Sequence, residues 1–148
     1  MKTQGIRIKD LKENKVVAVK FPDILEEIPN GNSLYWSILY LDAMGRLGEG
    51  KSIPVFEKQI NDSENGFFIT WADLNLLSKK FHQIIDITLI GCKDEKLLGR
   101  YETDEELHQT CDIVIEMIDS SYWEVFSKDE DLIARLKAKF RDTELLEI

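Results

Sequence analysis

The sequence predicts an α+β fold, with a mostly antiparallel sheet of five or six strands and about three helices. Three observations predict it. Several apolar runs alternate with polar residues at a period of two, short turn signals join neighbouring runs, and capping patterns open two helices. The chain has 148 residues, of which 43% are hydrophobic and 32% charged. This composition is typical of a globular protein, and the length fits a single domain spanning residues 1–148.

Six segments have the composition of strands. Val17, Val19 and Phe21 alternate with their neighbours, and Pro22 ends that run. The run 34–43 is apolar at nearly every position, which favours a strand buried on both faces, although periodicity alone leaves a buried helix open. A turn at 119–121 predicts that the last two strands form a hairpin. The predicted strands span residues 5–11, 14–21, 34–43, 86–92, 111–118 and 122–127.

Three helices are expected near residues 54–60, 72–84 and 129–141. Thr70 precedes Asp73 by three residues, and Ser127 precedes Glu130 by the same spacing, so both pairs can cap free amides at a helix start. One apolar stripe runs along the second helix through Leu74, Leu77, Phe81 and Ile84. In the predicted strand 111–118, alternate residues are expected to point inward, namely Cys111, Ile113, Ile115 and Met117.

The predicted core contains five large side chains that lie on these runs and stripes: Trp36, Ile38, Phe81, Ile87 and Ile115. Cys92 and Cys111 are the only cysteines, and both lie in apolar runs. Two such residues do not make a disulfide framework, so we expect buried free thiols.

Charge is distributed unevenly along the chain. The formal net charge is −9, and the segment from Asp94 to Asp131 holds 13 acidic and 3 basic residues. An acidic surface repels phosphates and therefore argues against a nucleic-acid partner, while it attracts a basic protein. The alternative is that this segment is a solvated face that only keeps the protein in solution.

Targeting signals are not apparent in the sequence. Met1–Gly5 is not followed by the apolar run of a secretory signal, and no apolar stretch is long enough to span a bilayer. We therefore expect a cytoplasmic protein that does not contact membrane.

Residues 45–52 match the phosphate-loop pattern, in which glycine amides surround phosphates, a lysine reaches them and a hydroxyl holds Mg²⁺. Pro54 follows the match closely, where it removes a helical amide unless it falls within the first turn. No run ending in an aspartate for Mg²⁺ stands out. We therefore predict that the segment binds no nucleotide, and a nucleotide-binding protein remains the alternative function.

Catalytic and metal signatures are also lacking. His82, Cys92, His108 and Cys111 have no spacing typical of zinc, so each histidine is expected to be satisfied locally or solvated. The serines lie in no nucleophile elbow, and neither cysteine has a catalytic histidine nearby in the sequence. The sequence thus predicts a chain that is not an enzyme and needs no metal or cofactor.

Aromatic residues alternate with acids near the end of the acidic segment, a composition typical of a surface that meets a basic protein. Loops and outward strand positions are expected to leave these side chains free of the core. The predicted partner-binding residues are Glu102, Asp104, Glu105, Glu106, Asp112, Glu116, Tyr122, Glu124 and Phe126. An ordinary core strand with a normal surface is the competing interpretation.

Three segments, 66–71, 86–91 and 112–123, resemble immunity proteins of bacterial contact-dependent growth inhibition and other polymorphic toxin systems. The resemblance covers roughly residues 34–136. It implies a small cytoplasmic protein that neutralises a toxin domain, often a nuclease, by occluding its active site. Toxins of this kind are commonly basic, which agrees with the acidic segment. A structural or regulatory subunit of another complex is a third possibility, and the oligomeric state stays open.

Overall fold

The computed structural model describes residues 2–10 and 18–147, which form one seven-stranded sheet and five α-helices. Every strand pairing is antiparallel, and the strand order is β3-β2-β4-β5-β6-β1-β7. The α+β class is confirmed, with more strands and helices than predicted. The strands are β1 (Gln4–Ile8), β2 (Tyr35–Gly45), β3 (Phe67–Ile69), β4 (Phe81–Cys92), β5 (Ile113–Ile118), β6 (Tyr122–Ser127) and β7 (Thr143–Leu146). The helices are α1 (Phe21–Leu25), α2 (Ile53–Asn61), α3 (Trp71–Ser78), α4 (Asp104–Thr110) and α5 (Glu130–Lys139).

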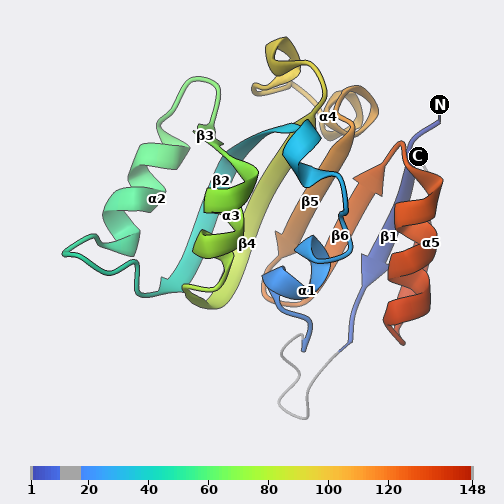
Figure 1. Cartoon of the computed structure of the whole chain (residues 1–148), viewed down its shortest axis with the longest axis horizontal. Coiled ribbons are helices and arrows are strands. Elements are labelled where there is room, and N and C mark those ends of the chain that lie inside the picture. The colour runs from blue at the N-terminus through green and yellow to red at the C-terminus, as the bar shows by residue number, and fades with distance from the viewer. Residues whose placement is uncertain (1, 11–17, 148) are drawn as a thin grey trace.

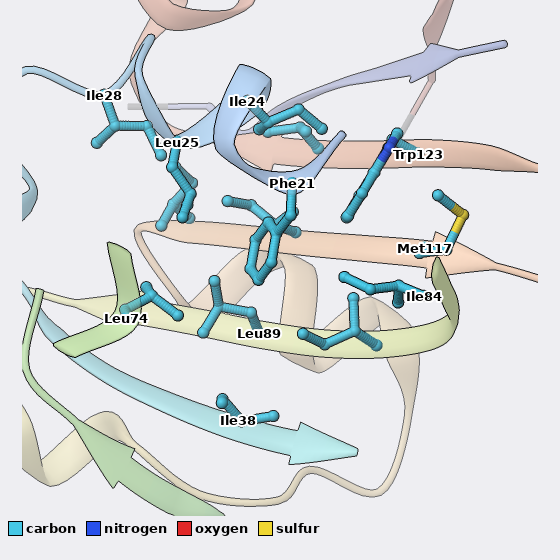
Figure 2. Close-up of a cluster of buried hydrophobic side chains, with 14 of the residues drawn as sticks. Phe21, Ile24, Leu25, Ile28, Ile38, Leu74, Ile84, Leu89, Met117 and Trp123 are labelled. Carbon is cyan, nitrogen blue, oxygen red and sulfur yellow. The ribbon is translucent and has the colours of Figure 1, made fainter. Parts of the chain in front are cut away.

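One face of the sheet carries the main core, because α1, α3 and α5 all lie in front of it (Figure 1). Phe21, Ile24 and Leu25 of α1 lie in this cluster, over the strands that carry Leu89 and Met117 (Figure 2). Four of the five predicted core residues are almost fully buried, which confirms the prediction for Trp36, Ile38, Ile87 and Ile115.

The predicted helix 72–84 is wrong in its second half. Thr70 caps α3 as expected, since its Oγ1 accepts a hydrogen bond from the Asp73 amide at 3.2 Å. The helix ends at Ser78, however, and Phe81 begins β4 as a half-buried residue. Pairing of β4 with β2 begins at Phe81 itself, and this non-local ladder overrides the helical spacing of Phe81 and Ile84.

The predicted strand 14–21 is also corrected. Residues 14–17 lie outside the described part of the chain, Ala18 to Lys20 form no strand, and Phe21 begins α1. Pro22 therefore opens a helix instead of ending a strand. The first turn of a helix tolerates proline because its amide has no partner there.

The cap of α5 departs from expectation, and the edge of β2 has an unusual neighbour. Asp129, not Ser127, caps α5, and its Oδ1 accepts from the Asp131 amide at 3.0 Å. Figure 1 shows α2 beside the edge of β2. Side chains of α2 accept hydrogen bonds from β2 amides that a neighbouring strand would otherwise have satisfied. Glu57 Oε2 accepts from the Ala43 amide at 2.7 Å, and Asn61 Oδ1 accepts from the Leu41 amide at 3.1 Å.

Among residues 2–10 and 18–147, a helix covers the opposite face of the sheet at only one end. There, α4 buries a second apolar cluster that includes Leu107, Cys111, Val114 and Phe126. Cys111 therefore belongs to this cluster and not to the inward series of Ile113, Ile115 and Met117, because β5 begins only at Ile113. Beyond α4, β2 leaves the side chains of Tyr40 and Met44 exposed, so this strand is not buried on both faces along its length.

Candidate functional site

A row of side chains crosses six strands on the face of the sheet that α1, α3 and α5 do not cover. Residues directly opposite each other in an antiparallel ladder point to the same side of the sheet. Their sequence neighbours Ile6, Leu41, Ile87, Ile115 and Val125 are buried in the main core, which places the row on the other side. In strand order the row reads Tyr40, Thr88, Glu116, Glu124, Arg7 and Glu144.

Two carboxylates meet directly in this row, since Glu116 of β5 pairs with Glu124 of β6. Like charges in opposite positions destabilise a sheet unless each has a partner. Arg7 Nη2 lies 2.7 Å from Glu124 Oε2, and His108 Nε2 of α4 lies 2.7 Å from Glu116 Oε1. Both glutamate side chains are only 14% exposed, so these contacts hold the pair in place.

Arg7 is the organising cation of the row. Its Nε also donates to Glu124 at 2.8 Å, its Nη1 lies 3.7 Å from Glu144, and its guanidinium lies 4.6 Å from the centre of the Tyr122 ring. The hydrogen bond to Glu124 raises the pKa of Arg7, against the opposing effect of burial. The charge of Arg7 is thus compensated by glutamates of the neighbouring strands β6 and β7.

A second row, next to the first, carries carboxylates that lack such a cation. Asp42 of β2 pairs directly with Asp86 of β4. Asp86 Oδ1 accepts a hydrogen bond from the Asp119 amide at 2.9 Å, and neither aspartate forms a salt bridge with any residue that the structure describes. Ile118 and Tyr122 continue this row on β5 and β6. We call the two rows together with Met44 the open face.

The acids of α4 border the open face at the end that this helix covers. Thr103 caps α4 by accepting from the Glu106 amide at 3.1 Å, and Asp104, Glu105 and Glu106 form its exposed first turn, just after exposed Glu102. The prediction of free loop acids is therefore corrected for these three residues. A threonine followed three residues later by glutamate is the capping signal that would have revealed the helix.

The structure brings Glu116, Tyr122 and Glu124 together but separates two other predicted site residues from them. Phe126 is 5% exposed beneath α4, where the His108 ring stacks on it with centroids 3.6 Å apart. It cannot serve as an exposed anchor. Asp112 lies before β5, and its Oδ2 accepts from the Lys93 amide at 2.7 Å. The sequence reasoning missed Arg7, Tyr40, Asp42 and Asp86, whose place is set by strand register.

The phosphate-loop match lies where β2 leads into α2. Ser52 caps α2 through its own hydroxyl, which accepts from the Val55 amide at 3.3 Å, and Pro54 falls in the first turn. The objection from Pro54 is therefore removed. The setting still differs from a phosphate loop between parallel strands, because β2 pairs antiparallel with both of its neighbours.

Histidine and cysteine side chains are the candidate metal ligands and nucleophiles of the sequence. Residues 2–10 and 18–147 contain no group of three or more His, Cys, Asp or Glu side chains placed to hold a metal ion. Both cysteines are buried free thiols, as predicted. The neighbouring Cys92 thiol raises the pKa of Cys111, and burial raises it further. The His108 ring has a hydrogen-bond partner in Glu116, as expected for a histidine with a local partner.

Comparison with known proteins shows the family of the chain. Within the described part, no helix combines the length and apolar character needed to cross a membrane. No curated protein and no solved structure matches the sequence. Residues 4–148, nearly the whole chain, match the family described as "Protein of unknown function (DUF2691)". The chain therefore belongs to the DUF2691 family.

Proposed function

We propose that this chain binds a basic protein through the open face, and that the partner is a toxin domain whose active site the chain occludes. The observation that carries the proposal is the direct pairing of Asp42 with Asp86, without a salt bridge to any described residue, on the part of this sheet face that α4 leaves uncovered. The acidic first turn of α4 adds charge of the same sign at the border of this face.

Apolar and aromatic groups on the open face suit a protein partner better than a small ion. Tyr40 is 43% exposed and Met44 is 49% exposed, both on β2. Tyrosine and methionine are enriched where proteins meet, and both can bury large apolar areas there. Arg7 holds Glu124 and packs over Tyr122, so this part of the face is ordered before a partner arrives.

Charge and contact area have separate effects on such a complex. Carboxylates that face solvent accelerate the encounter with a basic surface, and salt screens this effect. Side chains that the partner buries on binding, such as Tyr40, set how slowly the complex dissociates. The resemblance to immunity proteins supplies the biological context, in which a cytoplasmic protein protects its own cell from a toxin.

The proposal is tested by expressing the chain together with the product of its neighbouring gene, then measuring co-purification and cell growth. The double variant Tyr40→Ala/Asp42→Lys removes one anchor and reverses one charge on the open face. Its matched control is Leu76→Ala/Glu130→Lys, because Leu76 on α3 and Glu130 on α5 are exposed on the helical side of the sheet.

We expect the wild-type chain and the control to co-purify with the partner and protect the cell, while the open-face variant loses both properties. The proposal fails if the open-face variant behaves like the control. The immunity context fails separately if a partner co-purifies but the chain gives no protection against it.

A further inference from the structure

Two asparagine–glycine pairs occur in this chain, Asn30–Gly31 before β2 and Asn65–Gly66 before β3. Asparagine is among the thermolabile residues of proteins. It loses its side-chain amide most readily when glycine follows, because glycine places no side chain beside the attacking backbone nitrogen. The fold gives the two pairs very different surroundings, although both consist of the same two residues.

The pair Asn65–Gly66 lies in the loop that joins α2 to the edge strand β3 (Figure 1). Asn65 is exposed, and its Oδ1 lies 3.3 Å from the point that a Cβ on Gly99 would occupy. Because Gly99 carries no side chain, the Asn65 side chain has room to rotate. The Asn65 carbonyl accepts a hydrogen bond from the Ser37 hydroxyl at 3.2 Å, which is long for such a bond and therefore weak.

The fold itself requires glycine at position 66. The φ angle of Gly66 is 91°, in the left-handed region that favours glycine. A Cβ at this position would collide with Ser37 Oγ and would crowd Leu39 on β2. The close approach of the loop to β2 therefore places a glycine directly after an exposed asparagine.

The pair Asn30–Gly31 is held in place by its surroundings. The Asn30 carbonyl accepts hydrogen bonds from the Ser33 amide at 3.0 Å and from the Ser33 hydroxyl at 2.7 Å. Gly31 is buried, its carbonyl accepts from the Trp36 indole N–H at 2.9 Å, and the Trp71 ring fills the place of its missing side chain. The Gly31 amide therefore reaches the Asn30 side chain only after these contacts open.

From these differences we propose that Asn65 is a deamidation site of the folded protein and that the fold protects Asn30. The Gly66 backbone nitrogen loses its proton to hydroxide and forms a bond to Cγ of Asn65. The bond from Cγ to Nδ2 breaks, ammonia leaves with a proton from water, and a cyclic succinimide remains. Water then opens the ring on either side of its nitrogen, which gives aspartate or isoaspartate. The reaction needs only water, so it is independent of the proposed partner.

Isoaspartate at position 65 would disturb β3, because its main chain is longer by a methylene. Phe67 follows Gly66 directly, and β3 pairs with β2 over only three residues. The longer main chain moves the carbonyl of residue 65 away from Ser37 and shifts this short ladder. We therefore expect the backbone amides of β3 to exchange with solvent faster in the isoaspartate form, while those of β7 stay unchanged.

The test is an incubation of the full chain in mildly alkaline buffer made with heavy-oxygen water. Peptide mapping by mass spectrometry measures the heavy oxygen gained at each pair, and electron-transfer fragmentation distinguishes isoaspartate from aspartate. The same measurement in concentrated urea gives the two rates without the fold. The variant Asn65→Gln removes the reactive residue, because the longer side chain closes the ring far more slowly, and Asn30→Gln is its matched control.

In the folded protein we expect Asn65 to react roughly tenfold faster than Asn30, because the Ser33 hydrogen bonds and the tryptophan contacts must open before Asn30 reacts. In urea the two rates should approach each other. Asn65→Gln should abolish the uptake in the peptide that carries residue 65, and Asn30→Gln should leave that uptake unchanged.

Equal rates at the two pairs in the folded protein, or a faster reaction at Asn30, would overturn the assignment. A rate ratio in urea as large as in the folded protein would show that the fold does not cause the difference. Unchanged exchange of the β3 amides in the purified isoaspartate form would overturn the predicted disturbance of β3.

Discussion

Replacing Arg7 with glutamine tests whether this residue organises the open face. The change leaves the Glu124 side chain, only 14% exposed, opposite Glu116 and without its cation. The Arg7 side chain is 28% exposed, so solvent screens the lost contact only in part. We therefore expect the free energy of unfolding to fall clearly, unlike the effect of removing a surface charge.

The size of this loss follows from two contributions. A hydrogen bond to a charged group contributes about 1.5–3 kcal/mol. Two like charges left in opposite positions of a sheet add a penalty of roughly 0.2–1 kcal/mol. Glutamine keeps part of the packing over Tyr122 and can still donate one hydrogen bond, so we expect a loss of about 2 kcal/mol.

Urea unfolding followed by tryptophan fluorescence measures this loss. The control is Lys58→Gln, which breaks a surface pair with Asp62 whose side chains are 79% and 63% exposed, and this change should leave the free energy of unfolding nearly unchanged. The double variant Arg7→Gln/Glu124→Gln should be more stable than Arg7→Gln alone, because the carboxylate left without a cation is then only the 60% exposed Glu144 and no longer the 14% exposed Glu124. If Arg7→Gln costs no more than the control, the reasoning about the row is refuted.

Three further predictions concern other parts of the molecule. Phe126→Ala should lower the free energy of unfolding by about 3–5 kcal/mol in urea titrations, because Phe126 is a buried support of α4, and a loss under about 1 kcal/mol would contradict that placement. Burial raises the pKa of Tyr101 from 10.0 to about 12, so its contribution to stability is complete below pH about 10 and is lost as the pH rises through about 12. The stability of Tyr101→Phe should not show this loss when unfolding is measured at alkaline pH. The same pH dependence in Tyr101→Phe and in the wild type would contradict the prediction. Calorimetric titration with Mg-ATP and Mg-GTP should show no binding at residues 45–52, and micromolar binding abolished by Lys51→Ala would instead support the nucleotide alternative.

Local signals in the sequence predicted several elements well. Thr70 was identified as a helix cap from its spacing to Asp73, and the turn at 119–121 correctly joins β5 to β6. The Thr103 cap carried the same kind of signal for α4 and was overlooked. Phe81 was misassigned because an apolar residue at helical spacing is equally compatible with a strand, and pairing with β2 decides between them.

The candidate site depends on contacts that no local pattern contains. Glu116 and Glu124 could be placed at outward positions by alternation, but Arg7 reaches Glu124 across 117 residues of sequence. Tyr122, Glu124 and Phe126 alternate on one strand and so share a face, yet only Phe126 is buried by α4. Alternation thus identifies the face of a side chain, while the packing of another element determines whether a partner can reach it.

The rate of association with the basic partner tests the central claim most directly. Asp42→Asn/Asp86→Asn removes the two uncompensated charges and keeps an oxygen that can accept from the Asp119 amide, while Glu130→Gln/Asp131→Asn removes two exposed charges on α5. The Debye length falls from about 30 Å at 0.01 M salt to about 8 Å at 0.15 M, so steering is strongest at low salt. The account predicts that only the open-face variant associates more slowly at low salt, and that the difference shrinks at 0.15 M. Equal association rates for both variants at low salt would contradict it.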